Sequence, residues 1–310
     1  RLAKAARKVP TQLEFVDIAG LVRGASKGEG LGNQFLANIR EVDAIAHVLR
    51  CFEGSDVTHV EGSVDPLRDA ETVETELMLA DLESLEKRVV TAQKKARGGD
   101  KEAKTQLEVM EPILALLREG KPGRAFTPTP EQASLVKQLQ LLTTKPVLYV
   151  CNVEEEAAAT GNELSRKVAA KAAQEGASSV VISAAIEAEV AALPDETERQ
   201  AFLESLGLSE TGLARVIRAG YGLLNLITYF TAGPKEARAW TVRKGAKAPE
   251  AAGVIHSDFE RGFICAEVIA YDDYVAYGGE QGAKEAGKMR QEGRDYVVAD
   301  GDVMLFRFNV

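Results

Sequence analysis

Three short polar segments of the chain carry residue types that could bind a nucleoside triphosphate. In the first, an apolar run ends at Asp17, and Gly20 follows three residues later. In P-loop nucleoside triphosphatases, an Asp at the carboxyl end of a strand helps to hold Mg²⁺, and a Gly at this spacing turns its N–H towards the γ-phosphate. Asp17 and Gly20 fit these two roles, although any turn after a strand also favours both residue types.

The second segment, residues 152–155, reads Asn-Val-Glu-Glu and follows another apolar run. Guanine-binding proteins have Asn-Lys-x-Asp at the corresponding place, where the acid accepts hydrogen bonds from the base and the Asn holds the loop together. Here Val153 replaces the Lys, and Glu155 is longer than the Asp. We therefore predict that Asn152, Val153 and Glu155 enclose the base without a firm preference for guanine.

The third segment is Ser183-Ala184, at the end of a further apolar run. Guanine-binding proteins have a Ser-Ala turn here, whose backbone contacts the base. One polar loop after a strand is common, but three such loops in this order favour a nucleotide site.

These segments require strands that end at one edge of a sheet. Apolar residues on both faces predict strands of a parallel sheet that helices cover. Helical patterns lie between the strands, which predicts a doubly wound α/β domain. The expected strands are 13–17, 44–52, 146–152 and 178–183.

A long helical segment separates the second and third expected strands. Apolar residues recur at alternating spacings of four and three over 73–89 and 103–117, as in two helices packed side by side. Gly98 and Gly99 predict the turn that makes these helices antiparallel, and Pro112 predicts a kink or a restart of the second helix.

The expected tip of this hairpin is rich in cations. Such a cluster is either an ordinary solvated surface or a contact for RNA phosphates on a large partner, and the sequence leaves both interpretations open. The cations are Lys94, Lys95, Arg97, Lys101 and Lys104.

From residue 223 onward the pattern changes to short strands separated by turns. Helical segments at 248–255 and 282–290 lie among them, which predicts a small mixed sheet with a helix across it. Trp240 either packs into this domain or binds RNA together with nearby cations, and core packing is the simpler explanation.

The composition is that of a globular protein. The 310 residues are 45% hydrophobic and 27% charged, with a formal net charge of −9. This charge argues against general coating of nucleic acid, and no DNA sequence specificity is expected. No stretch reads as a signal peptide or a membrane span, and three dispersed cysteines predict reduced core residues of a cytoplasmic protein.

Over essentially its whole length, the chain resembles the YchF/Obg-like ATPase family. The resemblance rests on residues 15–22, 24–33, 152–155 and 238–242. It implies an NTPase domain, an inserted antiparallel α-helical hairpin and a C-terminal TGS domain of β-grasp type. The corresponding ranges are 1–65 with 142–222, 66–141 and 223–310. It further implies Mg²⁺, ATP as the preferred substrate with GTP as the alternative, and association with ribosomes or ribosomal RNA.

Two departures bear on hydrolysis. The motif Gly-x-x-x-x-Gly-Lys-Ser/Thr does not occur in the sequence; in the family it precedes the region where this chain begins, and we expect that it has been left off. The glycines of 24–32 are no substitute, because they lack a Lys-Ser/Thr pair.

Leu21 stands where Ras-like enzymes have the Gln that orients water, so slow intrinsic turnover is expected. His59, in a polar loop, is the candidate for this role by elimination, although a lone loop His is usually only solvated.

The leading hypothesis is an ATPase or GTPase that acts as a ribosome-associated regulatory switch. The alternative is a non-hydrolytic module that docks RNA, the ribosome or a protein and holds a structural nucleotide. A switch must bind its partner differently in its nucleotide states, so nucleotide-dependent ribosome affinity separates the two. A Rossmann oxidoreductase is excluded, because the glycine spacing and the required ribose-binding acid do not fit.

Overall fold

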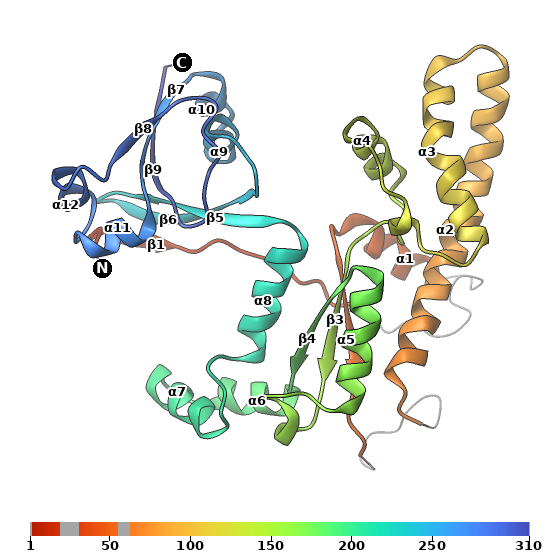
Figure 1. Ribbon diagram of the computed structural model, residues 1–310, viewed down its shortest axis with the longest axis horizontal. Helices are drawn as coiled ribbons and strands as arrows, with labels where there is room; N and C mark the ends of the chain where they lie inside the picture. The colour runs from red at the N-terminus through yellow and green to blue at the C-terminus, as the bar shows by residue number, and fades with distance from the viewer. Residues whose placement is uncertain (1, 19–30, 55–62, 310) are drawn as a thin grey trace. The chain divides into compact units, whose positions relative to one another are not determined.

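The computed structural model describes residues 2–18, 31–54 and 63–309 (Figure 1). The chain forms two compact units. The first joins Arg1–Phe15 to Leu224–Val310, and the second is Val16–Leu223. In the part of the chain that the structure describes, no helix is both long enough and apolar enough to cross a membrane.

The second unit contains a three-stranded parallel sheet. Its strands are β2 (Ile45–Arg50), β3 (Val147–Asn152) and β4 (Ser178–Ile182), in the order β2-β3-β4. The central strand β3 is buried from Val147 to Cys151, as expected for a strand that is covered on both faces. Three of the four predicted strands are therefore confirmed, and so is their parallel arrangement.

The strand expected at 13–17 is wrong. Residues 10–18 are irregular, and the side chains of Phe15 and Val16 are 49% and 53% exposed. A strand needs a neighbour for its backbone hydrogen bonds, and none of the described residues pairs with this segment. An apolar run was therefore not sufficient to predict a strand here.

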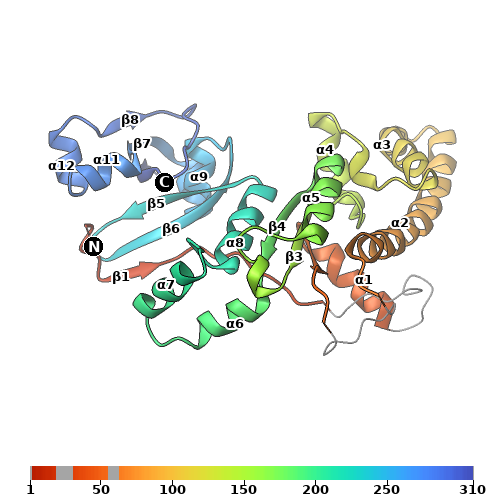
Figure 2. The same ribbon diagram turned by 60° about the horizontal axis from the view of Figure 1, so that its bottom comes forward.

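Helices of the second unit pack against this sheet. In Figures 1 and 2, α5 (Glu163–Glu175) lies alongside β3 and β4, and its Val168 and Ala172 pack in the core with Tyr149 and Cys151. Outside the segment between β2 and β3, the other helical elements of the second unit are α1 (Leu31–Glu41), η3 (Glu155–Ala157), α6 (Ala184–Ala192), α7 (Glu196–Ser205) and α8 (Gly212–Leu223).

The predicted helical hairpin is present. Its helices α2 (Pro66–Arg97) and α3 (Lys101–Arg118) lie side by side in both views (Figures 1 and 2) and share a core in which Leu85 and Ile113 are fully buried. Asp65 caps α2 and Asp100 caps α3, each through a carboxylate that accepts backbone N–H groups. The expected restart at Pro112 is wrong, because α3 continues through it.

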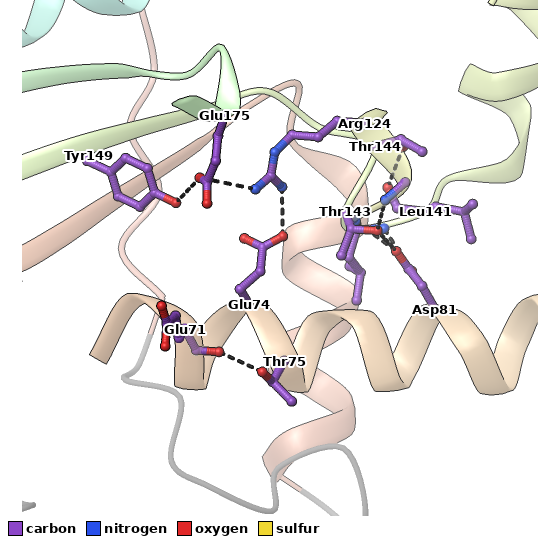
Figure 3. A network of polar contacts seen from close by, with 12 residues as sticks. Glu71, Glu74, Thr75, Asp81, Arg124, Leu141, Thr143, Thr144, Tyr149 and Glu175 are labelled. Carbon is purple, nitrogen blue, oxygen red and sulfur yellow. Dashed lines mark hydrogen bonds and ion pairs between the residues drawn. The ribbon is translucent and has the colours of Figure 1, made fainter. Parts of the chain in front are cut away.

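The hairpin is anchored to the sheet through a buried carboxylate (Figure 3). The side chain of Asp81, on α2, is 0% exposed and accepts hydrogen bonds from the loop before β3. Its partners are the N–H of Leu142 at 2.9 Å and both the N–H and the hydroxyl of Thr143 at 2.8 and 2.7 Å. Burial raises the pKa of Asp81, while these hydrogen bonds oppose the rise.

A second polar contact of Figure 3 joins the hairpin to β3 itself. Arg124, in η2 (Gly123–Ala125), lies 2.8 Å from Glu74 of α2 and 3.9 Å from Glu175 of α5. Glu175 also accepts a hydrogen bond of 2.9 Å from the hydroxyl of Tyr149. Burial and this carboxylate raise the pKa of Tyr149, so its hydroxyl stays protonated and donates. From η2 the chain continues into α4 (Pro130–Leu139).

The first unit is a six-stranded mixed sheet with short helices, as predicted. The strand order is β1-β6-β5-β9-β7-β8. Tyr229, Val268 and Met304 are buried between this sheet and α9 (Ala248–Ile255). The strands are β1 (Arg7–Val9), β5 (Leu226–Ala232), β6 (Glu236–Arg243), β7 (Phe263–Ile269), β8 (Arg290–Glu292) and β9 (Val303–Phe308), and the other helices are α10 (Ser257–Arg261), α11 (Tyr271–Ala276) and α12 (Glu280–Glu285).

Residues 1–15 lie with this sheet, whereas the sequence assigns them to the nucleotide domain. The cause is the parallel pairing of β1 with β6, from Arg7 opposite Glu236 to Val9 opposite Arg238. Trp240 of β6 packs against the core and donates its indole N–H to the hydroxyl of Thr231 at 2.9 Å. Its packing agrees with the core interpretation.

Candidate nucleotide site

The polar segments that follow β2, β3 and β4 lie at one edge of the sheet, because parallel strands end on the same side. Arg50 ends β2, Asn152 ends β3, and Ser183 follows β4. In open α/β sheets this edge is where ligands bind.

The structure brings Asn152 and Ala184 into contact. The Asn152 side-chain oxygen accepts a hydrogen bond of 2.9 Å from the Ala184 N–H, and the Asn152 carbonyl accepts one of 2.8 Å from the Cys51 N–H. Asn152 thus ties the loop after β3 to the segments after β2 and β4.

Val153 and Ser183 are both buried at this edge. The side chain of Val153 is 3% exposed within the core beside α5, so this residue can meet a ligand only through its backbone. Ser183 is 2% exposed at the N-terminus of α6, and its hydroxyl has no hydrogen-bond partner among the described residues.

The two acids of the Asn-Val-Glu-Glu segment have different surroundings. Glu155 begins η3 and is exposed. Glu154 is half-buried, and its carboxylate accepts hydrogen bonds of 2.8 and 3.1 Å from the side-chain amide of Asn162. Neither Glu154 nor Asn162 was predicted as a site residue from the sequence. The local signal for this contact is Asn162 itself, a typical N-cap residue before the helical pattern of α5.

The residues expected at the phosphate end are only partly described. The carboxyl of Asp17 is exposed, and its oxygens belong to the hard donor type that Mg²⁺ prefers. Gly20 and His59 lie outside the described residues. Among residues 2–18, 31–54 and 63–309, no group of three or more potential metal ligands is present. Asp17 by itself could supply at most one protein ligand of a magnesium ion.

The titratable groups on β2 and β3 are structural. Burial lowers the pKa of His47 to about 4, against a smaller opposing effect of Asp69, so this histidine is neutral near pH 7. Its ring lies 6.0 Å from that of Tyr149. The three cysteines are free. Cys51 and Cys151 are fully buried, as predicted for core residues, whereas Cys265 is only half-buried. The neighbouring Cys151 and burial both raise the pKa of Cys51, which keeps this thiol protonated.

The five cations of the hairpin tip are all exposed. They surround the turn of Gly98 and Gly99, where α2 ends and α3 begins. Within the described part of the chain, none of them has an acidic partner within 4.0 Å. The tip, formed by Lys94, Lys95, Arg97, Lys101 and Lys104, therefore presents a net positive charge, because only Asp100 and Glu102 stand against these five cations within residues 94–104.

Family models match both ends of the chain. A model described as a 50S ribosome-binding GTPase matches residues 3–92. A second model, YchF-GTPase_C, described as a protein of unknown function (DUF933), matches residues 226–309.

Curated relatives match nearly the whole chain. The Ribosome-binding ATPase YchF of Haemophilus influenzae is 59% identical over 309 residues, which is 100% of this chain and 85% of the relative. The protein of the same name from Bacillus subtilis is 56% identical over 98% of this chain and 83% of its own length. Obg-like ATPase 1 from Oryza sativa is 43% identical over 100% of this chain and 79% of its own length.

A solved structure matches the fold. The Schizosaccharomyces pombe YchF GTPase superposes with a TM-score of 0.85 at 36% identity, over 99% of this chain and 83% of that chain.

Proposed function

The chain belongs to the YchF family, and from this premise we propose that it is a ribosome-associated nucleoside triphosphatase with ATP as its preferred substrate. The observation that carries the nucleotide assignment is the hydrogen bond between Asn152 and Ala184, which draws two of the base-binding segments together at the ligand-binding edge of the sheet.

The proposed preference for ATP over GTP rests on the hydrogen-bonding groups that the contact between Asn152 and Ala184 occupies. The Ala184 N–H already donates to Asn152, so it is not free for an acceptor on the base. Guanine carries a carbonyl oxygen at position 6 and needs such a donor, whereas adenine carries an amino group there and needs an acceptor. The exposed carboxylate of Glu155 supplies acceptor oxygens.

Hydrolysis requires groups at the phosphate end. In this proposal Asp17 helps to hold Mg²⁺, Gly20 contacts the γ-phosphate and His59 positions the attacking water. When bound, Mg²⁺ would supply positive charge that offsets the negative charge developing on the phosphates during hydrolysis. Slow intrinsic turnover is expected, because Leu21 cannot hydrogen-bond to water in place of a Gln.

The ribosome contact is assigned to the hairpin tip. Its five exposed cations suit the phosphates of ribosomal RNA, and phosphate binding is dominated by such charges. The same exposed charge would also serve the alternative function, a docking module in which the nucleotide is structural. A partner on the ribosome also implies a cytoplasmic location.

Calorimetric titration of the full gene product with Mg²⁺ and non-hydrolysable ATP and GTP analogues tests the proposal. Tighter binding of the ATP analogue is expected. Tighter GTP binding would show that Glu155 still reads guanine, and binding of neither would favour the docking module. Ribosome pelleting with ATP analogue or with ADP then tests the switch, since equal ribosome affinity in both states would refute it.

A further inference from the structure

All hydrogen-bonding groups of the Asn162 side chain are used within the fold. Its oxygen accepts the N–H of Ser165 at 2.9 Å and caps α5. Its amide nitrogen donates to the carbonyl of Cys51 at 2.5 Å and to the nearer carboxylate oxygen of Glu154 at 2.8 Å. The side chain therefore joins the end of β2, the loop after β3 and the start of α5.

These contacts continue into the base-binding segments. Cys51, whose carbonyl accepts from Asn162, donates its own N–H to the carbonyl of Asn152 at 2.8 Å. Asn152 in turn accepts the N–H of Ala184 at 2.9 Å. We call Cys51, Asn152, Glu154, Asn162 and Ala184 the strand-end network. It is an unbroken set of hydrogen bonds from the start of α5 to the start of α6.

The backbone before Asn162 is shaped for this contact. Gly161 has φ +69°, in the left-handed region that favours glycine. A Cβ at this position would stand 2.6 Å from the hydroxyl of Ser165, which itself receives the Asn162 N–H. The turn thus brings Asn162 close to both β2 and β3.

The strand-end network separates the roles of two adjacent acids. Glu154 is held by Asn162, and Glu155 is left exposed at the start of η3. We propose that Asn162 is a positioning residue for nucleobase recognition: its amide holds Glu154 and the end of β2, and so sets where Glu155 and Ala184 meet the base. This inference rests on the proposed nucleotide function.

Asn162→Asp isolates the amide from the helix cap. Asp caps a helix about as well as Asn, so the bond to the Ser165 N–H is kept. The two donated hydrogen bonds are lost, and a carboxylate then faces the carboxylate of Glu154 and the carbonyl of Cys51. Loss of a charge-assisted bond and the added repulsion should weaken binding of the base by about tenfold or more.

The experiment compares two ligands on the full gene product by calorimetry. One is the Mg²⁺ complex of a non-hydrolysable ATP analogue, and the other is Mg²⁺ tripolyphosphate, which lacks the base. Asn162→Asp should weaken the first by about tenfold or more and leave the second unchanged. Ser165→Ala, which removes the hydroxyl that accepts the Asn162 N–H, is the control for α5; it should lower the melting temperature without changing the ratio of the two affinities.

A donor swap tests whether the pair itself matters. Adding Glu154→Gln to Asn162→Asp places an amide donor opposite a carboxylate again, so affinity for the ATP analogue should recover in part. An unchanged affinity in Asn162→Asp, an equal loss for both ligands or a failed recovery would each overturn the inference while leaving the nucleotide function in place. If the unaltered protein binds neither nucleotide, the proposed function and the inference fall together.

Discussion

Asp81→Asn should destabilise the second unit without affecting the first. The carboxylate of Asp81 is fully buried and accepts three hydrogen bonds, one from Leu142 and two from Thr143. An Asn retains one acceptor oxygen and turns an NH₂ group towards a buried N–H donor. At ~1.5–3 kcal/mol for a hydrogen bond to a charged group, losing one of the three lowers the free energy of unfolding by about 1.5–3 kcal/mol.

The two units can be followed separately in urea. The single tryptophan, Trp240, lies in the first unit, whereas the longest helices described, α2 and α3, lie in the second. Asp81→Asn should move the far-UV circular dichroism midpoint down by about 1 M and leave the tryptophan fluorescence midpoint in place. The effect should be confined to the second unit because Leu142 and Thr143, which donate to Asp81, both belong to it.

Asp100→Asn is the matched control. Asp100 caps α3 at the exposed hairpin tip through the Ala103 N–H, and Asn is an equally good cap, so both midpoints should stay within error. If Asp81→Asn leaves the circular dichroism midpoint unmoved, the anchoring role of the carboxylate is refuted. A parallel shift of both midpoints would instead refute the local nature of the effect.

Three further predictions concern pH, the hairpin tip and hydrolysis. The pKa of His47 falls from 6.5 to about 4 on folding, so the unfolded chain binds more protons than the folded chain between these pH values. The free energy of unfolding should therefore be greatest above pH 6.5 and fall by up to about 3 kcal/mol towards pH 4. In urea titrations, His47→Gln should show a smaller fall over the same pH range. The double variant Lys95→Glu, Lys101→Glu should weaken co-pelleting with ribosomes and reduce its salt dependence. Lys167→Glu, at an exposed position on α5, should change neither. An equal loss of ribosome binding in both variants would contradict a contact at the tip. His59→Ala should slow ATP turnover and leave the calorimetric affinity for the ATP analogue unchanged, and an unaltered rate would remove His59 from the mechanism.

The pattern of apolar residues predicted those strands and helices whose structure depends mainly on their own residues. The runs 44–52 and 146–152 are apolar on both faces and form β2 and β3. The alternating spacing around Gly98 and Gly99 forms the hairpin of α2 and α3. Residues 13–17 show the limit, because they have the same apolar character and yet find no partner strand among the described residues.

The sequence by itself therefore determined the family and the two polar segments that follow β3 and β4, whereas Asp17 does not end a strand. Only the tertiary structure decided which of their groups remain free to meet a ligand. It pairs Asn152 with Ala184, holds Glu154 through Asn162, and buries Val153, while Glu155 stays exposed. These partners are eight to more than thirty residues apart, and a hydrogen bond between them depends on the register of β2, β3 and β4, which no local pattern encodes.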